Sequence, residues 1–326
     1  MTDSVTDNVM DSVKDNVKDK AMDKRSALVF VYGNARRSEG NRKLLKGAER
    51  VAEQCWTAGK LHDTGEGYPV LCPGGGGFVY GELFRVPMET LRLLDAWEGI
   101  RDGACETGPR SQRSLRALQP VFTDRGEELA YVYLYPGAKR GELPSIEHGD
   151  WAFCRRERER ETLLYFAYAS CMDDERFRRA KVDHLFRDCL GRGVLRGYDL
   201  RFSRRAKDGG RADLAELGGG GWAEGKVYRI GTEALEYLKK REGVHAGHYR
   251  PAFVEIGVGP GGRMKRQALT FLVVRKSDVE SPPPPGYLLE IRRGGSTVWT
   301  AEYALSFERK LLALQTEAAA ATDTLK

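Results

Sequence analysis

Two glutamates occur in the same local context, Glu98 and Glu242, each at the end of a predicted helix and each followed by glycine and then a β-branched residue. A carboxylate at a helix C-terminus faces the negative end of the helix macrodipole, so helix electrostatics do not favour it there. Its recurrence therefore indicates a functional role, and a carboxylate that exchanges protons is a general acid/base. The alternative is a solvated side chain beside a helix-ending glycine.

Two strand-to-turn junctions are the second candidate feature. They read Tyr32-Gly33-Asn34-Ala35 and Tyr168-Ala169-Ser170-Cys171. A tight turn of small residues after a buried strand leaves consecutive backbone N–H groups pointing outward, where they can bind an anion or a developing oxyanion. The alternative is that each junction only reverses the chain.

The elements that position these residues recur along the chain, which indicates a duplicated domain. Gly81 precedes Glu98 by 17 residues, and Gly225 precedes Glu242 by the same number. Helices are predicted over 88–97 and 232–241. Apolar and β-branched runs predict strands over 28–32, 78–86 and 129–135 in the first half. In the second half they predict strands over 163–168, 197–203, 223–230, 250–258 and 267–274.

This pattern predicts an α+β fold of two tandem domains, each a mixed, largely antiparallel barrel-like sheet with a few flanking helices. The predicted domains cover residues 26–153 and 162–315, with a linker at 154–161 and a C-terminal tail at 316–326. Residues 1–25 contain a tetrapeptide repeated six times. Its apolar stripe is one small residue wide, so we expect a disordered or fraying extension, with a partner-binding helix as the alternative.

Composition excludes several classes of protein. The 326 residues are 41% hydrophobic and 31% charged, as in globular proteins, and the net charge of +6 is too small and too spread to indicate nucleic-acid binding. No segment resembles a transmembrane span or a signal peptide, so we expect no membrane partner and a cytoplasmic location. The six cysteines show no metal-binding spacing. His245 and His248 lie near Glu242 without a third ligand, so we expect no metal.

In both halves the order of these features resembles the γ-glutamylcyclotransferase family: a strand ending in Tyr-Gly-x-x, a glycine-containing strand, and a helix ending in Glu-Gly. In the first half the matching segments are 31–37, 39–41, 67–69, 81–82, 94–99, 132–133 and 149–151. In the second half they are 165–172, Gly225, 241–244, 247–249 and 284–287. The similarity extends over residues 27–310.

The resemblance implies a cofactor-free enzyme that converts the γ-glutamyl group of a small molecule to 5-oxoproline and releases an amine or amino acid. It makes Glu98 and Glu242 the acid/base residues. It also assigns the substrate-binding residues, which are Tyr32, Gly33, Asn34, Ala35, Tyr168, Ala169, Ser170, Cys171, Tyr249 and Tyr287. The second half is the more complete, because it keeps Tyr249 seven residues after its glutamate, whereas the first half has Cys105.

Both loops depart from the family pattern of Tyr-Gly-Ser-Asn or Tyr-Gly-Thr-Leu, and Ala169 would cost about 1 kcal/mol or more if its φ were positive. A non-catalytic tandem protein that binds small molecules is therefore the main alternative. An interaction protein that docks through its N-terminal repeat is another. The substrate stays open among γ-glutamyl dipeptides, γ-glutamylamines, glutathione and a γ-glutamyl-protected biosynthetic intermediate. The oligomeric state is also open, a monomer of two packed domains being one alternative.

Overall fold

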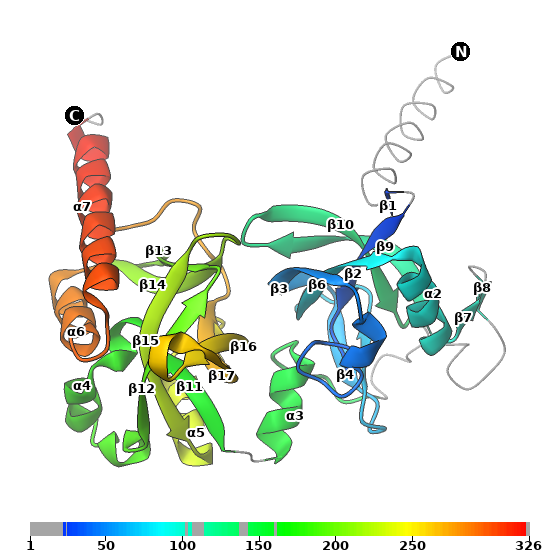
Figure 1. The fold of residues 1–326 in the computed structure, drawn as a ribbon, viewed down its shortest axis with the longest axis horizontal. Coiled ribbons are helices and arrows are strands. Elements are labelled where there is room, and N and C mark those ends of the chain that lie inside the picture. The colour runs from blue at the N-terminus through cyan, green and yellow to red at the C-terminus, as the bar shows by residue number, and fades with distance from the viewer. Residues whose placement is uncertain are drawn as a thin grey trace. The chain divides into compact units, whose positions relative to one another are not determined.

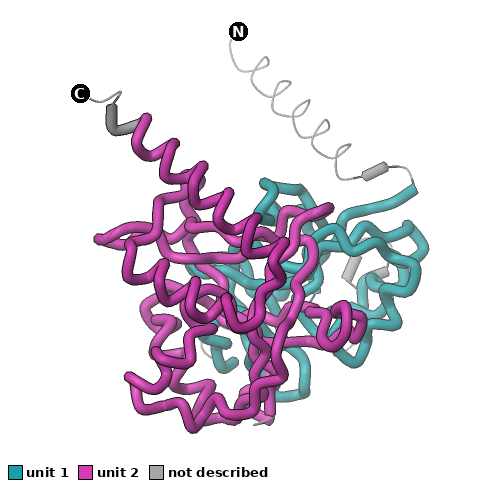
Figure 2. The backbone as a smooth tube through the Cα atoms, turned by 60° about the vertical axis from the view of Figure 1, so that its left-hand side comes forward, with its two compact units in different colours: residues 1–154 teal, residues 155–326 magenta. Residues whose placement is uncertain are grey.

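The structure is a computed structural model that describes residues 22–23, 25–101, 104–105, 114–136, 143–159 and 162–323. Its internal contacts divide the chain into two compact units, residues 1–154 and 155–326 (Figure 2). Most of the predicted N-terminal extension lies outside the described residues. Residues 22–23 form a short strand, β1(Met22–Asp23), that pairs with β2.

Unit 1 is a five-stranded barrel with one parallel pair (Figure 1). Its strands are β2(Ser26–Val31), β3(Glu49–Ala58), β6(Phe78–Pro87), β9(Leu115–Thr123) and β10(Gly126–Leu134). They pair in the order β2-β10-β9-β3-β6, and β6 pairs again with β2, which closes the ring. Only β2 and β10 run parallel. The smaller elements are β4(Lys60–Asp63), β5(Pro69–Cys72), β7(Ile100–Arg101), β8(Ala104–Cys105), η1(Arg42–Leu45), α2(Met88–Trp97) and α3(Trp151–Glu159).

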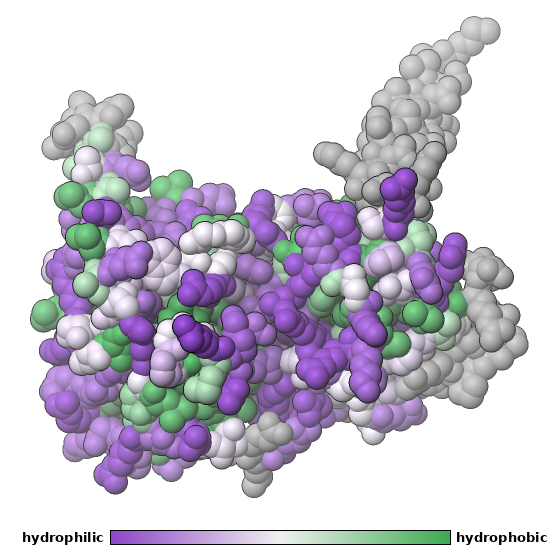
Figure 3. All heavy atoms as spheres, in the orientation of Figure 1, coloured by the Kyte–Doolittle hydropathy of each residue, from purple (hydrophilic) through white to green (hydrophobic). Residues whose placement is uncertain are grey.

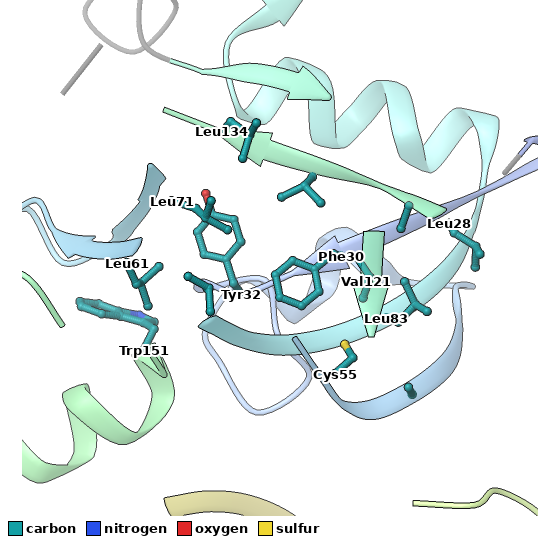
Figure 4. Close-up of a cluster of buried hydrophobic side chains, with 14 of the residues drawn as sticks. Leu28, Phe30, Tyr32, Cys55, Leu61, Leu71, Leu83, Val121, Leu134 and Trp151 are labelled. Carbon is teal, nitrogen blue, oxygen red and sulfur yellow. The ribbon is translucent and has the colours of Figure 1, made fainter. Parts of the chain in front are cut away.

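Strand β2 is buried on both faces from Ala27 onward, which explains its apolar sequence over 27–31. Alternate side chains point to opposite faces of a strand. Leu28 and Phe30 join one apolar cluster, which Tyr32 continues just beyond the strand end (Figure 4). Val29 and Val31 join a second cluster that contains Leu91 and Leu94 of α2 and therefore hold the helix against the sheet.

Unit 2 repeats this barrel. Its strands are β11(Leu163–Ala167), β12(Cys189–Arg196), β15(Trp222–Ile230), β16(Tyr249–Val258) and β17(Met264–Val273), closed in the order β11-β15-β12-β16-β17. A long hairpin, β13(Tyr198–Ala206) and β14(Gly209–Glu216), lies between β12 and β15 in the chain. The remaining elements are η2(Ala169–Met172), α4(Asp174–Arg179), η3(Asp183–Phe186), α5(Thr232–Arg241), η4(Pro260–Gly262), α6(Pro285–Gly295) and α7(Ala301–Asp323).

The strand pairings confirm the tandem, mixed-barrel fold. β11 runs parallel to β17 as β2 runs parallel to β10, and the other neighbours in unit 2 are antiparallel. In both barrels a glycine lies where the backbones of two neighbouring strands come closest. A Cβ atom on Gly81 would lie 2.4 Å from the carbonyl oxygen of Val31, and one on Gly225 would lie 2.2 Å from that of Ala167. Only glycine fits at either position, which explains why this residue recurs.

The structure differs from the prediction in the less apolar strands and at two connections. The barrel strands β3, β9 and β12 and the hairpin strand β14 were not predicted. Polar residues interrupt β3 and β9, two glycines interrupt β12, and β14 begins with two glycines. Residues 154–159 were predicted as part of a linker but continue α3. The unit boundary falls within this helix, and Arg156, which belongs to unit 2, lies 4.5 Å from the ring centre of Phe253 in the same unit. The predicted tail from residue 316 continues α7 to Asp323, since its alanine run favours a helix.

The visible surface of both units is mostly hydrophilic, with small apolar patches between polar side chains (Figure 3). Some of the apolar exposure is on α7, where Leu305 and Leu312 are 52% and 67% exposed. None of the helices among the described residues is both long enough and apolar enough to cross a bilayer.

Candidate functional site

The two candidate glutamates have the same backbone geometry. Glu98 is the C-cap of α2, with φ −79° and ψ −2°, and Glu242 is the C-cap of α5, with φ −78° and ψ −3°. The glycine after each takes a positive φ, 78° at Gly99 and 63° at Gly243, as glycines that end helices commonly do. The shared pattern of the sequence therefore corresponds to a shared local structure.

The hydroxyl groups of the two loop tyrosines bond to the backbone of the barrel. The Tyr32 hydroxyl donates to the carbonyl oxygen of Tyr133 at 2.8 Å, and the Tyr168 hydroxyl donates to that of Phe271 at 2.5 Å. Each bond joins the end of the first barrel strand to the last strand of the same barrel. Burial is the main cause that raises the pKa of both tyrosines well above the usual value of 10.

In unit 2 a cavity of about 370 Å³ brings together four of the predicted site residues, Ser170, Glu242, Tyr249 and Tyr287. Its other lining residues are Arg176, Arg204, Asp208, Arg211, Arg241, His248, Pro284, Gly286 and Glu290. Tyr168, Ala169 and Cys171 do not line it and are buried beside it. The second-half candidates therefore divide into cavity residues and supporting residues.

The Glu242 carboxylate is held from one side. Nη1 of Arg241 lies 2.8 Å from Oε1 of Glu242 and 2.5 Å from Sγ of Cys171, while the thiol donates to the same Oε1 at 3.2 Å. Burial raises the pKa of Cys171, so the thiol stays protonated at neutral pH and can donate. No described residue makes a hydrogen bond to Oε2 of Glu242. That oxygen is available to a ligand.

The loop of unit 2 begins a short 3₁₀ helix. Tyr168 is extended, with φ −119° and ψ 163°, and η2 starts at the next residue. The first N–H groups of a helix find no acceptor within it, so those of Ser170 and Cys171 can serve a ligand. Ala169 has a φ of +56°, the strained conformation considered from the sequence, whereas Gly33 is not among the residues with positive φ.

Two tyrosines and the β13–β14 hairpin complete the cavity. The Tyr249 hydroxyl donates to the carbonyl oxygen of Ala212 at 2.8 Å, and the N–H of Ala212 donates to the Tyr287 hydroxyl at 3.3 Å. Burial raises the pKa of Tyr287 to about 12, against hydrogen bonds from Ala212 and Ser170 that lower it. Tyr287 thus contacts the loop as well as the hairpin.

Unit 1 arranges its candidates differently. The Glu98 carboxylate accepts a hydrogen bond of 3.3 Å from Ser114. Burial is the largest cause of the raised pKa of Tyr32, and the negative charge of Glu98 is the second. The Asn34 side chain accepts from Nε1 of Trp151 at 2.6 Å and donates to the carbonyl oxygen of Gly67 at 2.8 Å. Ala35 is buried and the side chain of Cys105 lies outside the described residues.

A buried ion cluster that the sequence did not identify supports the loop of unit 1. Arg36, 2% exposed, lies 2.9 Å from Asp150 and 3.5 Å from Glu82. The backbone N–H of Arg37 donates to Glu82 at 3.0 Å. Unit 2 has Met172 in the place of Arg36, four residues after the loop tyrosine in each case, so the two loops are held differently. The sequence signal for this cluster was the pair Arg36-Arg37 directly after the loop.

Cationic residues of unit 2 were missed as well. Arg241 directly precedes Glu242, and Arg204 and Arg211 come from the β13–β14 hairpin. The only signal in the sequence was the high density of basic residues around this hairpin. In the described part of the chain, no group of three or more His, Cys, Asp and Glu residues is placed to hold a metal ion.

Comparison with known proteins identifies relatives of both units. Residues 29–153 match the family model described as gamma-glutamyl cyclotransferase, AIG2-like, and residues 223–305 match the AIG2-like family model. YkqA of Bacillus subtilis, provisionally named a gamma-glutamylcyclotransferase, is 37% identical over 294 residues, which cover 89% of this chain and 99% of YkqA.

The crystal structure of YkqA superposes with a TM-score of 0.77 at 36% identity, covering 89% of this chain and 98% of that one. A protein of Niallia circulans, named gamma-L-glutamyl-butirosin B gamma-glutamyl cyclotransferase, is 34% identical over 125 residues. That match covers 38% of this chain and 74% of the relative.

Proposed function

The chain belongs to the γ-glutamylcyclotransferase family, and from this premise we propose that it converts a γ-glutamyl compound to 5-oxoproline. The α-amine nitrogen of the substrate attacks its own γ-carbonyl carbon, so that a C–N bond forms and closes the ring. The bond from that carbon to the leaving nitrogen breaks. The α-ammonium loses two protons in becoming the ring N–H; both go to the leaving nitrogen, which departs as an ammonium, and no further reactant is needed.

The observation that carries the proposal is the cavity of unit 2, in which the carboxylate of Glu242 lies beside the Ser170 loop. An ammonium must lose a proton before it can attack, and a carboxylate within hydrogen-bond reach is a suitable base. With Oε1 held by Arg241 and Cys171, Oε2 is the atom that would take the proton. It would then pass it to the leaving nitrogen.

The loop supplies the second part of the mechanism. Negative charge develops on the γ-carbonyl oxygen as the ring closes, and preorganised N–H donors stabilise such charge most effectively in a site that excludes water. The N–H groups of Ser170 and Cys171 at the start of η2 are the proposed donors. Tyr249 and Tyr287 form the wall that keeps the glutamyl chain folded for an intramolecular attack.

Unit 1 is proposed to use Glu98 in the same role, with Asn34 and Ala35 in its loop. A ligand-binding role without turnover remains the second candidate for unit 2. One observation favours it: Arg241 already occupies one oxygen of Glu242, which leaves a single carboxylate oxygen for a substrate.

Release of 5-oxoproline from a panel of γ-glutamyl compounds tests the proposal. The variants are Glu98→Gln, Glu242→Gln and the double substitution. The controls are Glu89→Gln on α2 and Glu233→Gln on α5, exposed glutamates of the same helices. Loss of a general acid/base lowers the rate by about 10²- to 10⁴-fold, and the double variant should lose activity at both sites. Full activity in the double variant would contradict the proposal, and tight binding of these compounds without release would support the binding role.

A further inference from the structure

The cavity of unit 2 is rich in arginine. Four guanidinium groups line it against three carboxylates, and three of the arginines have partners. Arg241 pairs with Glu242 at 2.8 Å, and Arg176 pairs with Glu290. On the hairpin, Arg211 makes two bonds to Asp208, of 2.7 and 2.9 Å. These pairs leave one positive charge of the lining uncompensated.

The remaining cation is Arg204, which has no ion pair with any residue that the structure describes. It is half-buried, and its guanidinium carbon lies 5.7 Å from the ring centre of Tyr249. A guanidinium that has lost part of its hydration and stands in a cavity is a strong receptor for a carboxylate, which it can bind through two parallel hydrogen bonds.

The cavity has two walls with different chemistry. The Ser170 loop and the end of α5 bring the oxyanion donors and Glu242, which must face the glutamyl group. The β13–β14 hairpin brings Arg204 and Arg211. A glutamyl group that reacts against the first wall directs its leaving group toward the second.

We propose that Arg204 binds a carboxylate on the leaving group, so that unit 2 selects γ-glutamyl amino acids or peptides with a free carboxylate over γ-glutamylamines without one. This inference rests on the proposed function. We expect this preference in unit 2 alone, because the corresponding hairpin of unit 1, β4–β5, contains no arginine between residues 60 and 72; its Lys60 is exposed, and it also carries Asp63 and Glu66.

The test compares two substrates of nearly equal shape, γ-glutamylalanine and γ-glutamylalaninamide, which differ in the charge of the leaving group. Measurements are made in the Glu98→Gln background, so that 5-oxoproline reports on unit 2. Arg204→Gln removes the charge and Arg204→Lys keeps it. The matched control is Arg205→Gln, since Arg205 is the exposed neighbour on the same strand and does not line the cavity.

We expect the parent to prefer the acid, and Arg204→Gln to lower kcat/KM for the acid about 10- to 100-fold with little change for the amide. The loss should appear in KM more than in kcat, Arg204→Lys should restore part of it, and Arg205→Gln should change neither substrate. Equal losses for acid and amide would overturn the inference, because Arg204 would then bind the glutamyl group or support the fold. A parent without preference for the acid would also overturn it.

Calorimetric titration of the full chain with the same two compounds separates this inference from the proposed function. If the folded protein releases no 5-oxoproline, the proposed function fails. The carboxylate preference still stands when the acid binds about tenfold or more tightly than the amide and Arg204→Gln removes that difference. Absence of binding of the acid overturns the inference, whereas the proposed function is decided by the panel of γ-glutamyl compounds.

Discussion

Gly225 is the position where a single methyl group should disable unit 2. In Gly225→Ala the new Cβ would lie 2.2 Å from the carbonyl oxygen of Ala167. That distance is about 1 Å short of ordinary contact, and the atom opposite belongs to the backbone, so it cannot rotate away. Strands β11 and β15 would have to separate locally. We expect a loss of about 3 kcal/mol in the free energy of unfolding, at the upper end of the usual cost of overpacking.

The same displacement should affect activity, because Ala167 directly precedes the loop that begins at Tyr168. A shift of about 1 Å in groups that position a substrate can cost about 10²-fold in rate. In the Glu98→Gln background, we therefore expect Gly225→Ala to reduce 5-oxoproline release by about that factor. The corresponding variant Gly81→Ala, whose Cβ would lie 2.4 Å from the Val31 oxygen, should do the same to unit 1 when measured in the Glu242→Gln background.

Denaturant unfolding followed by tryptophan fluorescence suits this test, since Trp222 lies on the same strand as Gly225. The matched control is Gly231→Ala at the end of that strand, where φ is −97° and a new Cβ would have no neighbour within 4 Å. It should stay within about 1 kcal/mol of the parent. If Gly225→Ala were as stable as this control and kept the activity of unit 2, the reasoning from close approach would be refuted.

Three other substitutions have defined outcomes. Arg36→Met leaves two carboxylates buried without a counterion, and we expect a loss of about 3–5 kcal/mol in denaturant unfolding, whereas a loss below about 1 kcal/mol would contradict the role assigned to this cluster. Burial opposes ionisation of Asp173, but hydrogen bonds and charge from Arg293 lower its pKa, so this pair stabilises the fold above pH 4 and its contribution is lost as the pH falls through the folded pKa. Arg293→Met should therefore destabilise at pH 7, and this deficit should shrink as the pH falls through the folded pKa of Asp173; a deficit that does not change with pH would argue against this linkage. Because burial raises the pKa of Tyr287 to about 12, Tyr287→Phe should lower kcat/KM about 2- to 10-fold without shifting the pH profile between 6 and 10, and a shifted profile would show that its ionisation matters.

Much of the fold was predictable because its signals are local. The apolar run before Tyr32 predicted β2, and helical periodicity predicted α2 and α5 with the bounds that the structure has. The recurrence of Glu98 and Glu242 predicted two equivalent C-caps. These features depend on neighbouring residues along the chain, where side-chain spacing and glycine conformation act directly.

The environment of each glutamate was decided by tertiary structure. Cys171 lies 71 positions from Glu242 in the chain, and only the closed barrel brings its thiol against the carboxylate. Arg204 lines the cavity because it lies on the β13–β14 hairpin, of which the sequence predicted only the first strand. Such contacts depend on strand register and barrel closure, which place residues together without any mark in the local sequence.

The sequence by itself determined the duplication, the barrel strands with strong apolar signals, the two loop-and-glutamate sets and the glycines of closest approach. The tertiary structure alone decided which loop residues face the cavity. The Tyr168 hydroxyl bonds to the carbonyl oxygen of Phe271, 103 residues away, whereas Ser170 lines the cavity. The physical reason is that a strand sets which side chains alternate, while closure of the barrel sets what each side chain meets.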